Sequence, residues 1–275
     1  MYGNFTEALV QLFEIGDSIL EIGPGIYIAP TISILQNIRP KSYVAVDGAL
    51  HSEDSFEKFN QIGGLQEYSR KILNFFGYLP HNLLPVCSLA HSLPLSSKSV
   101  QNVLFVKTLS KLTDGILNYW EGAKKSVIEE YKRRGINNLE EKEYKTLSIL
   151  TYSLLVLDEA RRVGIKNIVI IPESAYIEEE TLNELKIYSD LTKSDLYVLD
   201  VKNPTWKIEE DGKIVEVGHW QDNLVRKLVC LKIKNSAPMG KEEIVRYLKG
   251  IYKDESYKRT VFRSLYEKLL YAGEA

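Results

Sequence analysis

Short apolar runs of strand length alternate along the chain with longer stretches that have a helical pattern of apolar residues. Parallel strands need a crossover connection, which is usually a helix, so this alternation predicts a mostly parallel sheet with helices on both faces. Strands of such a sheet are buried on both faces and are apolar along their length, as these runs are. We expect an α/β fold with seven strands. The predicted strands are Ser18–Ile22, Ser42–Val46, Leu83–Cys87, Val100–Val106, Asn167–Ile171, Leu196–Val201 and Leu224–Ile233.

Helices are predicted in most of the intervals between these strands. Gly63-Gly64 interrupts one of them, and Gly164 is placed to end another as its C-cap. No linker marks a domain boundary, so we predict one α/β domain over residues 1–238, with a helical insertion over about 112–156 and a helical C-terminal extension over 239–275. The predicted helices are Thr31–Asn37, Asp54–Phe76, Gly115–Arg134, Glu140–Val163, Glu178–Tyr188, Lys241–Tyr252 and Ser256–Tyr271.

The composition is that of an ordinary globular protein without a large excess of charge. Of the 275 residues, 44% are hydrophobic and 26% are charged, and 35 basic residues stand against 37 acidic ones, for a net charge of -2. Such a chain has no long-range field to draw it onto nucleic acid or an anionic membrane, so any nucleic-acid contact needs a local patch. Scarce Cys and Met beside abundant Lys, Glu, Ile and Tyr are typical of thermophile proteins.

The cysteines and the longest apolar window bear on the cellular compartment. Cys87 and Cys230 lie in predicted strands, where a small buried thiol is the common case, so we expect no disulfide. The first 16 residues lack a basic stretch followed by a long apolar one, and the window Ile149–Leu157 is too short to cross a bilayer. These features predict a soluble, cytoplasmic protein with no membrane partner.

The first predicted strand runs directly into a Gly-Pro-Gly turn at residues 23–25. Gly23 and Gly25 lack the β-carbons that would keep a ligand away from the backbone, and the helix behind the turn presents free amides and its positive end. The second strand leads to Asp47, about 22 residues after Gly25, where a carboxylate can accept hydrogen bonds from ribose hydroxyls. The spacing fits one strand-helix-strand unit and predicts a cradle for a ribose-bearing ligand.

These residues resemble the cofactor motifs of a known family. Leu20-Glu21-Ile22-Gly23-Pro24-Gly25 resembles motif I of the class I S-adenosylmethionine-dependent methyltransferases, which have a Rossmann-like fold, and Ala45-Val46-Asp47 resembles their second motif. Ser88–Val106 is similar to the family's third-strand loop and fourth strand, and Leu157–Ile171 to the helix and fifth strand that follow. The resemblance spans roughly residues 15 to 235 and implies S-adenosylmethionine as the cofactor.

The resemblance also implies a role for each matching residue. Gly23 and Gly25 would face the methionine part of the cofactor, and Glu21 would brace that loop or bind the amino group. Asp47 would bind the ribose, the loop after the third strand would lie near the adenine, and the end of the fourth strand would line the opening toward the sulfonium and the methyl acceptor. The implied cofactor-binding residues are Glu21, Gly23, Pro24, Gly25, Asp47, Gly48, Leu89, Ala90, Val106 and Lys107, with Thr108 beside the last two.

Two departures from the family pattern favour an alternative. Tyr27 stands where the family usually has a third glycine, and Leu89 stands where it usually has an acid. The second hypothesis is therefore a methyltransferase-like chain that no longer catalyses and serves as a binding or scaffold protein.

A dinucleotide site matches the sequence less well than a methyltransferase site, because Ile28 occupies the position of the third small residue in G-x-G-x-x-G. The Asn/Asp-Pro-Pro-aromatic signature of amino-directed nucleic-acid methyltransferases is absent after the fourth strand.

The sequence identifies no catalytic residue and predicts no metal site. The histidines lack the spacing of metal ligands, although His91 lies near the predicted cofactor site and is a candidate acid or base. A G-x-S-x-G elbow is missing, which disfavours hydrolase chemistry. Methyl transfer gains its rate mostly from proximity and desolvation, so the acceptor leaves little trace in the sequence. The four histidines are His51, His81, His91 and His219.

The two helical additions are placed to select the unknown methyl acceptor. A segment inserted after the fourth strand begins at the edge of the sheet where ligands bind. Acids and bases are mixed along it, which is typical of a solvated helix, so a small-molecule or protein acceptor is favoured over nucleic acid. The C-terminal extension resembles a helix-turn-helix, with Lys258, Arg259 and Arg263 on its second helix, and would be the route to nucleic acid.

Overall fold

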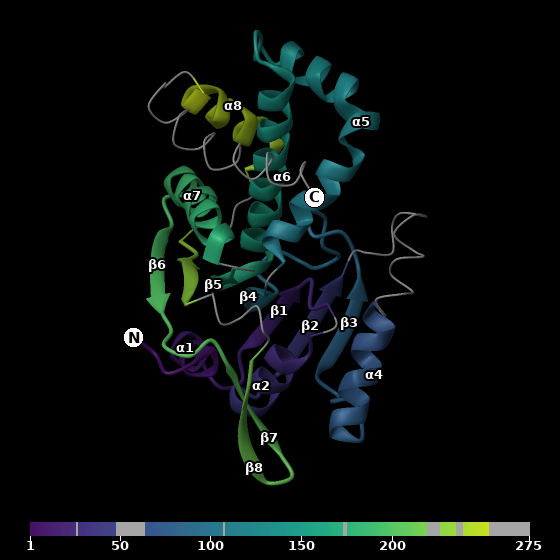
Figure 1. Cartoon of the computed structure of the whole chain (residues 1–275), viewed down its shortest axis with the longest axis vertical. Coiled ribbons are helices and arrows are strands. Elements are labelled where there is room, and N and C mark those ends of the chain that lie inside the picture. Colours follow the sequence, from purple (N-terminus) through teal and green to yellow (C-terminus); the bar gives the residue numbers. More distant parts are fainter. Residues whose placement is uncertain are drawn as a thin grey trace.

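A computed structural model gives the fold of the chain (Figure 1) and describes residues 1–25, 27–47, 64–106, 108–172, 175–218, 226–234 and 239–252. Seven of the described strands form one sheet in the order β3-β2-β1-β4-β5-β9-β6. Strands β1 to β5 are parallel, whereas β9 is antiparallel to both of its neighbours. The predicted mostly parallel, seven-stranded Rossmann-like sheet is confirmed. Its strands are β1 (Ser18–Ile22), β2 (Ser42–Asp47), β3 (Leu83–Cys87), β4 (Val100–Val106), β5 (Gly164–Ile171), β6 (Asp195–Asp200) and β9 (Lys227–Lys232).

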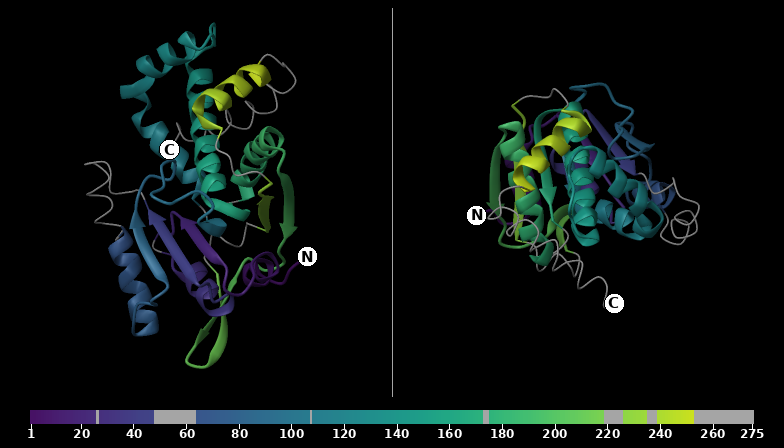
Figure 2. Two further views of the ribbon diagram at one scale, coloured as in Figure 1. Left: turned by 180° about the vertical axis from the view of Figure 1, so that it is seen from behind. Right: turned by 90° about the horizontal axis from the view of Figure 1, so that it is seen from above.

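Helices cover both faces of this sheet, as predicted (Figure 2). Helices α1, α2 and α4 pack on one face, α6 and α7 pack on the other, and α5 packs against α6. The predicted helix Ser256–Tyr271 and the first part of Asp54–Phe76 lie outside the described residues. Within the described ranges, no helix combines the length and the apolar character needed to cross a membrane. The helices are α1 (Phe5–Leu12), α2 (Ala29–Asn37), α4 (Gly64–Phe76), α5 (Leu109–Arg133), α6 (Glu141–Val163), α7 (Ala175–Thr192) and α8 (Gly240–Tyr252).

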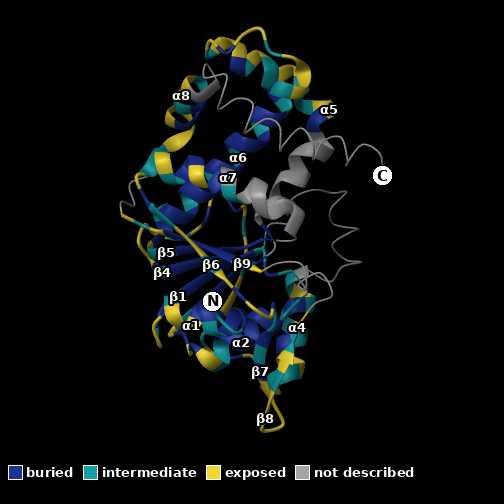
Figure 3. Cartoon of the chain, turned by 60° about the vertical axis from the view of Figure 1, so that its left-hand side comes forward, coloured by how far each residue is buried: buried dark blue, intermediate teal, exposed yellow. Residues whose placement is uncertain are grey.

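Side chains that alternate along each central strand build two hydrophobic clusters, one on each face of the sheet. In β1, Leu20 and Ile22 join the cluster under α6, whereas Ile19 joins the cluster under α1 and α2. All five residues of β1 are buried, and buried strands occupy the middle of the molecule (Figure 3). Burial on both faces is the reason why these strands are apolar throughout.

Gly164 ends α6, as the sequence predicts, but for a different physical reason. A C-cap glycine usually adopts a left-handed conformation, whereas Gly164 has φ -83° and already belongs to β5. A β-carbon here would lie 2.8 Å from Ile233 Cδ1 and 3.0 Å from the carbonyl oxygen of Ala160. The glycine therefore relieves crowding where α6 ends and β5 begins.

Helix α1 and one β-hairpin were not predicted from the sequence. The hairpin consists of β7 (Trp206–Glu210) and β8 (Lys213–Val217), and it packs on α1 and α2, where the Phe5 and Trp206 rings lie 5.3 Å apart. Its turn residues, Asp211 and Gly212, have φ +51° and +73°, as a type I′ turn requires. An Asp-Gly pair between alternating residues is a hairpin signal, and Asn4, which caps α1, is a helix-start signal. Both signals were present in the sequence.

The expectation that both cysteines are buried is wrong for Cys87. Cys230 is buried in β9, but Cys87 is exposed, and both thiols are free. Cys87 lies at the end of β3, which is an edge strand with only its first residue, Leu83, buried. An apolar run therefore predicted the strand correctly but not its position at the edge.

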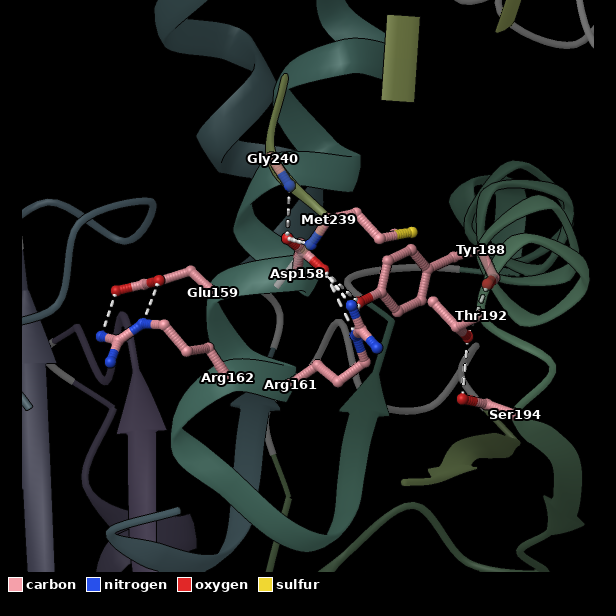
Figure 4. A network of polar contacts seen from close by, with 9 residues as sticks. All are labelled: Asp158, Glu159, Arg161, Arg162, Tyr188, Thr192, Ser194, Met239 and Gly240. Atoms are coloured by element: carbon pink, nitrogen blue, oxygen red, sulfur yellow. Dashed lines mark hydrogen bonds and ion pairs between the residues drawn. The ribbon is translucent and has the colours of Figure 1, made fainter. Parts of the chain in front are cut away.

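A buried polar network joins the start of α8 to α6 and joins α6 to α7 (Figure 4). Asp158 Oδ2 accepts hydrogen bonds from the backbone amides of Met239 (2.9 Å) and Gly240 (3.3 Å), and Oδ1 accepts from Arg161 Nη2 (2.6 Å). Arg161 Nε also donates to Tyr188 Oη of α7 (2.9 Å). Asp158 thus caps the first turn of α8, where free amides and the positive helix end favour a carboxylate. The start of the C-terminal extension is joined to the main fold through this carboxylate.

Replacing Asp158 by Asn tests this anchor. The change removes the charge that pairs with the buried Arg161, so we expect the free energy of unfolding to fall by about 3–5 kcal/mol. Urea denaturation followed by circular dichroism measures the loss. Glu67→Gln is the matched control, because Glu67 pairs with Arg70 on the surface of α4 and should cost no more than about 1 kcal/mol. Equal losses in the two variants would contradict an anchoring role for Asp158.

Candidate functional site

The strand order reverses between β1 and β4, and this position defines the candidate site. From β1 the chain proceeds to β2 and β3 on one side, whereas β4 and β5 lie on the other side. In open α/β sheets, ligands bind outside the carboxyl ends of the strands at such a point. The carboxyl end of β1 carries the Gly-Pro-Gly turn, the end of β2 carries Asp47, and Thr108 follows β4. Helices α5 and α8 and the first part of α6 stand beyond these ends (Figure 1).

A close contact with Thr108 requires glycine at position 23, and the sequence did not indicate this contact. The backbone of Gly23 has φ +68°, and a β-carbon there would lie 2.0 Å from Thr108 Cγ2. Thr108 Oγ1 donates to the carbonyl oxygen of Gly23 (2.7 Å), and the Gly23 amide donates to the Val46 carbonyl (2.7 Å). The space left by the absent side chain is therefore filled by a neighbouring strand end, not left open for a ligand. Gly23 fixes the turn against β2 and β4.

Gly25 is the glycine whose missing side chain leaves open space. Its φ is +59°, a conformation that favours glycine, and apart from its chain neighbours no atom of the described residues lies within 4 Å of the position that a β-carbon would take. A ligand can approach the backbone here. Of the two glycines, Gly25 thus has the property that the sequence interpretation assigned to both.

Glu21 lies on the opposite side of β1 from Leu20 and Ile22, inside the cluster under α2. Its side chain is 1% exposed. Its Oε2 accepts hydrogen bonds from Tyr43 Oη (2.5 Å) and Thr31 Oγ1 (3.1 Å), and Tyr68 Oη donates to Thr31 Oγ1 (3.1 Å). Burial raises the pKa of Glu21 to about 7. The carboxyl group therefore joins β1 to β2 and to the first turn of α2.

The three hydroxyl groups of the network around Glu21 were missed by sequence reasoning. They come from β2, α2 and α4, and no local motif links them. The available signal was the two-residue period of β1, which places Glu21 on the face opposite Leu20 and Ile22. A polar residue at a buried strand position requires partners from the elements that cover that face.

Asp47 and the loop after β3 lie together at the edge of the sheet. Asp47 pairs with Cys87 in the parallel register, and the Ser88 amide donates to the Asp47 carbonyl oxygen (3.3 Å). Beyond it, Ala90 is buried and Leu89 is exposed. The structure thus brings the implied ribose and adenine residues into one region. Of the remaining implied residues, Val106 is buried at the end of β4, whereas Gly48 and Lys107 lie outside the described residues.

Tyr27, the main departure from the family pattern, is half-buried and packs against the hydrophobic cluster under α1 and α2. Part of its ring surface is therefore used in the fold. The next residue, Ile28, packs against the same cluster.

His91 contacts the helical insertion. Its Nδ1 lies 3.2 Å from Tyr152 Oη of α6, and the two rings are 5.2 Å apart. Burial lowers the pKa of His91, while the nearby Glu159 carboxylate opposes this shift. A neutral imidazole beside the candidate site is chemically able to accept a proton. His51 and His219 lie outside the described residues, and no cluster of potential metal ligands occurs within the described ones.

The strand order, and the turn at the position where that order reverses, define a chain of the Rossmann-like α/β class. No protein-family model matches the chain, and no curated protein matches its sequence. Similar solved structures include a SAM-dependent methyltransferase from Aquifex aeolicus, with 15% identity, 83% of this chain and 89% of that chain covered, and a TM-score of 0.44.

Two further similar structures have comparable coverage. M. jannaschii TYW2 in complex with AdoMet has 10% identity, 82% of this chain and 73% of that chain covered, and a TM-score of 0.35. Precorrin-6y C5,15-methyltransferase from Geobacter metallireducens has 12% identity, 82% and 84% covered, and a TM-score of 0.41. These identities are too low to carry a function over to this chain, so its function has to be inferred from the arrangement of its own residues.

The contact between Gly23 and Thr108 yields a double-mutant test. Gly23→Ala should lower the free energy of unfolding by about 2–4 kcal/mol, because it combines a left-handed backbone with a steric clash. Thr108→Ser removes Cγ2 and keeps the hydroxyl, so it should recover part of the loss when added to Gly23→Ala. Urea unfolding of the wild type, both single variants and the double variant measures the coupling. Strictly additive losses would contradict this contact.

Proposed function

We propose that the chain binds S-adenosylmethionine at the carboxyl ends of β1, β2 and β4 and transfers its methyl group to an acceptor. The observation that carries this proposal is the open, left-handed Gly25 at the point where the strand order reverses. A β-carbon at this position would occupy the space through which a ligand reaches the backbone. Asp47 ends the neighbouring strand on the same edge, where a ribose-binding carboxylate is needed.

The residues present fit an adenosyl ligand. Asp47 would accept hydrogen bonds from the ribose, Ala90 and the exposed Leu89 would lie against the adenine, and the backbone of Pro24 and Gly25 would contact the methionine part. The bound cofactor supplies an electrophilic methyl group on a sulfonium. Glu21 is enclosed in the core, so its proposed part is to brace the turn and not to bind the amino group.

The protein's contribution to methyl transfer would be positioning and exclusion of water. Holding the acceptor in line with the methyl group converts an encounter between two molecules into a step within one complex. Helix α5 and the first part of α6, which stand beyond the strand ends, would cover the acceptor (Figure 1). An acceptor that carries a proton needs a group to take it, and neutral His91 on the contact with α6 is the candidate.

Calorimetry with S-adenosylmethionine and S-adenosylhomocysteine tests the proposed cofactor. We expect both to bind the wild type, and Asp47→Ala to weaken binding by about 1–3 kcal/mol through lost charged hydrogen bonds. Gly25→Ala should weaken binding by at least about tenfold, because its β-carbon enters the space used by the ligand. Gly77→Ala is the matched control. Gly77 has φ +74° and an equally open β-carbon position, but it lies between α4 and the start of β3, at the amino ends of the strands and away from the proposed site.

Failure of both compounds to bind at millimolar concentration would contradict the proposed function. That result would favour the alternative of a methyltransferase-like binding or scaffold protein. In that case Tyr27→Gly, which restores the third glycine of the family pattern, should create or strengthen cofactor binding. Cofactor that copurifies with the wild-type protein would argue against the alternative.

We propose further that the acceptor is a small molecule or a protein. One lysine of α5 and one of α8 are paired with acids, which leaves less positive charge for a phosphate backbone. Lys124 pairs with Glu121 (2.7 Å) and Glu141 (3.4 Å), and Lys241 pairs with Glu130 (2.8 Å). The basic residues of the alternative helix-turn-helix, Lys258, Arg259 and Arg263, lie outside the described residues.

An electrophoretic mobility shift assay with RNA and DNA tests the acceptor class. We expect no binding at physiological salt, because the net charge is near zero and acids are interleaved with the bases along α5. Binding that resists salt and disappears when Lys258, Arg259 and Arg263 are all changed to Ala would contradict the prediction. It would make nucleic acid the favoured acceptor.

A further inference from the structure

The β3–β4 loop, residues 88–99, contains no helix, and all of its residues are described. The other crossovers between parallel strands each include at least one helix, namely α2, α4, and α5 with α6. A crossover without a helix leaves its backbone amides and carbonyls to find partners elsewhere. Leu89 and Ala90, which are proposed to lie against the adenine, belong to this loop. The way in which the loop is held therefore bears on the proposed cofactor site.

Arg162, in the last turn of α6, supplies partners for the second half of the loop. Its Nη1 donates to the carbonyl oxygen of Leu95 (2.8 Å) and to Ser97 Oγ (3.4 Å), and its Nη2 donates to the carbonyl oxygen of Leu93 (3.2 Å). Its own backbone carbonyl accepts from the Lys98 amide (2.9 Å). A guanidinium can bond several acceptors at once because its N–H donors form a rigid, planar fork.

Glu159, one turn earlier in α6, completes this contact (Figure 4). Its carboxylate accepts from Arg162 Nη2 (2.6 Å) and Nε (2.7 Å), and its Oε1 also accepts from the Leu93 amide (2.8 Å). Only 19% of the Arg162 side chain and 14% of the Glu159 side chain is exposed. Hydrogen bonds between charged groups are stronger than neutral ones, and shielding from water strengthens them further. We call Glu159 and Arg162 the α6 clamp.

The turn that carries Leu89 and Ala90 is fixed between β3 and the α6 clamp. The Ser88 hydroxyl donates to the Ser92 carbonyl oxygen (3.0 Å), and the Ser92 amide donates to the Leu89 carbonyl oxygen (3.0 Å), so the turn is closed on itself. The next residue, Leu93, is bonded by both members of the α6 clamp. Ala90 and Leu93 are buried in the cluster under α6. The position of the turn is thus set by side chains of α6.

We propose that Arg162, held by Glu159, is a positioning residue for the cofactor, because it keeps the β3–β4 loop in the geometry that receives the adenine. This inference rests on the proposed function. A loop that adopts its binding geometry for only part of the time reduces the affinity for its ligand by that fraction. The α6 clamp orders the loop before the ligand arrives, so it would raise the affinity without touching the ligand.

Two substitutions of Arg162 test the inference. Arg162→Met keeps an apolar stem and removes every side-chain bond to the loop, whereas Arg162→Lys keeps the charge beside Glu159 but has a single nitrogen. We expect hydrogen exchange of residues 88–99, measured by mass spectrometry without ligand, to become faster in both variants, while that of α2 stays as in the wild type. Arg162→Lys retains the ion pair, so it serves as the test variant if Arg162→Met does not fold.

Titration calorimetry of the same proteins measures the effect on binding. The ligands are S-adenosylhomocysteine and 5′-methylthioadenosine, which contains the adenine and the ribose but lacks the amino-acid part. We expect both dissociation constants to rise by the same factor, at least about tenfold in Arg162→Met and less in Arg162→Lys. Gly25→Ala should instead weaken S-adenosylhomocysteine more than 5′-methylthioadenosine, because Gly25 is proposed to contact the methionine part. Either ligand should slow the exchange of residues 88–99 in the Arg162 variants.

Arg70→Met is the matched control. Arg70 also pairs with a glutamate three residues before it, Glu67, but this pair lies on the surface of α4, which covers the other face of the sheet. The variant loses a comparable ion pair without any change at the β3–β4 loop. It should therefore keep the wild-type affinity for both ligands and the wild-type exchange of residues 88–99.

The outcomes separate the two proposals. Faster exchange of residues 88–99 with unchanged dissociation constants would overturn the positioning role of Arg162 and leave the proposed cofactor intact. Unchanged exchange of this loop, or a greater loss of affinity for S-adenosylhomocysteine than for 5′-methylthioadenosine in the Arg162 variants, would overturn it as well. No binding of S-adenosylhomocysteine or S-adenosylmethionine by the wild type would overturn the proposed function, and the positioning role with it.

Discussion

Burial of β1 on both faces is the constraint on which the rest of the structure depends. A strand enclosed on both sides needs helices above and below, and helices can reach both faces only if the chain leaves β1 in one direction and later returns to its other side. The strand order therefore reverses beside β1, between it and β4. The candidate site is a geometric result of this reversal, because ligands of open α/β sheets bind outside the carboxyl ends of the strands at such a point.

The same constraint explains how much of the fold could be predicted from the sequence. Strands buried on both faces are continuous apolar runs, so β1, β2 and β4 were located within one residue of their ends. The Gly-Pro-Gly turn and Asp47 were found because their spacing is local to one strand-helix-strand unit. Edge and surface elements carry weaker patterns: β3 was found but its exposure at Cys87 was not, and the β7–β8 hairpin was overlooked despite its Asp-Gly turn.

What the sequence could not supply was the identity of contacts between distant segments. Gly23 was correctly identified as a special position, but the side chain that requires the glycine is Thr108, which is 85 residues away. The two hydroxyls that bond Glu21 come from β2 and α2, so a motif that names the acid cannot indicate whether it faces a ligand or the core. Such assignments depend on which residues the completed sheet and its helices bring together.

The position of β9 bears on how the chain reaches its final structure during synthesis. β9 comes after β6 in the chain but is inserted between β5 and β6, so β6 joins the sheet through a strand that is made later. Until Lys227–Lys232 has left the ribosome, β5 has an uncovered edge, and the Leu196–Leu199 stretch of β6 has no strand of the sheet beside it. Unpaired apolar edges invite association with other chains. An incomplete chain is thus marked by an exposed edge that the complete chain covers.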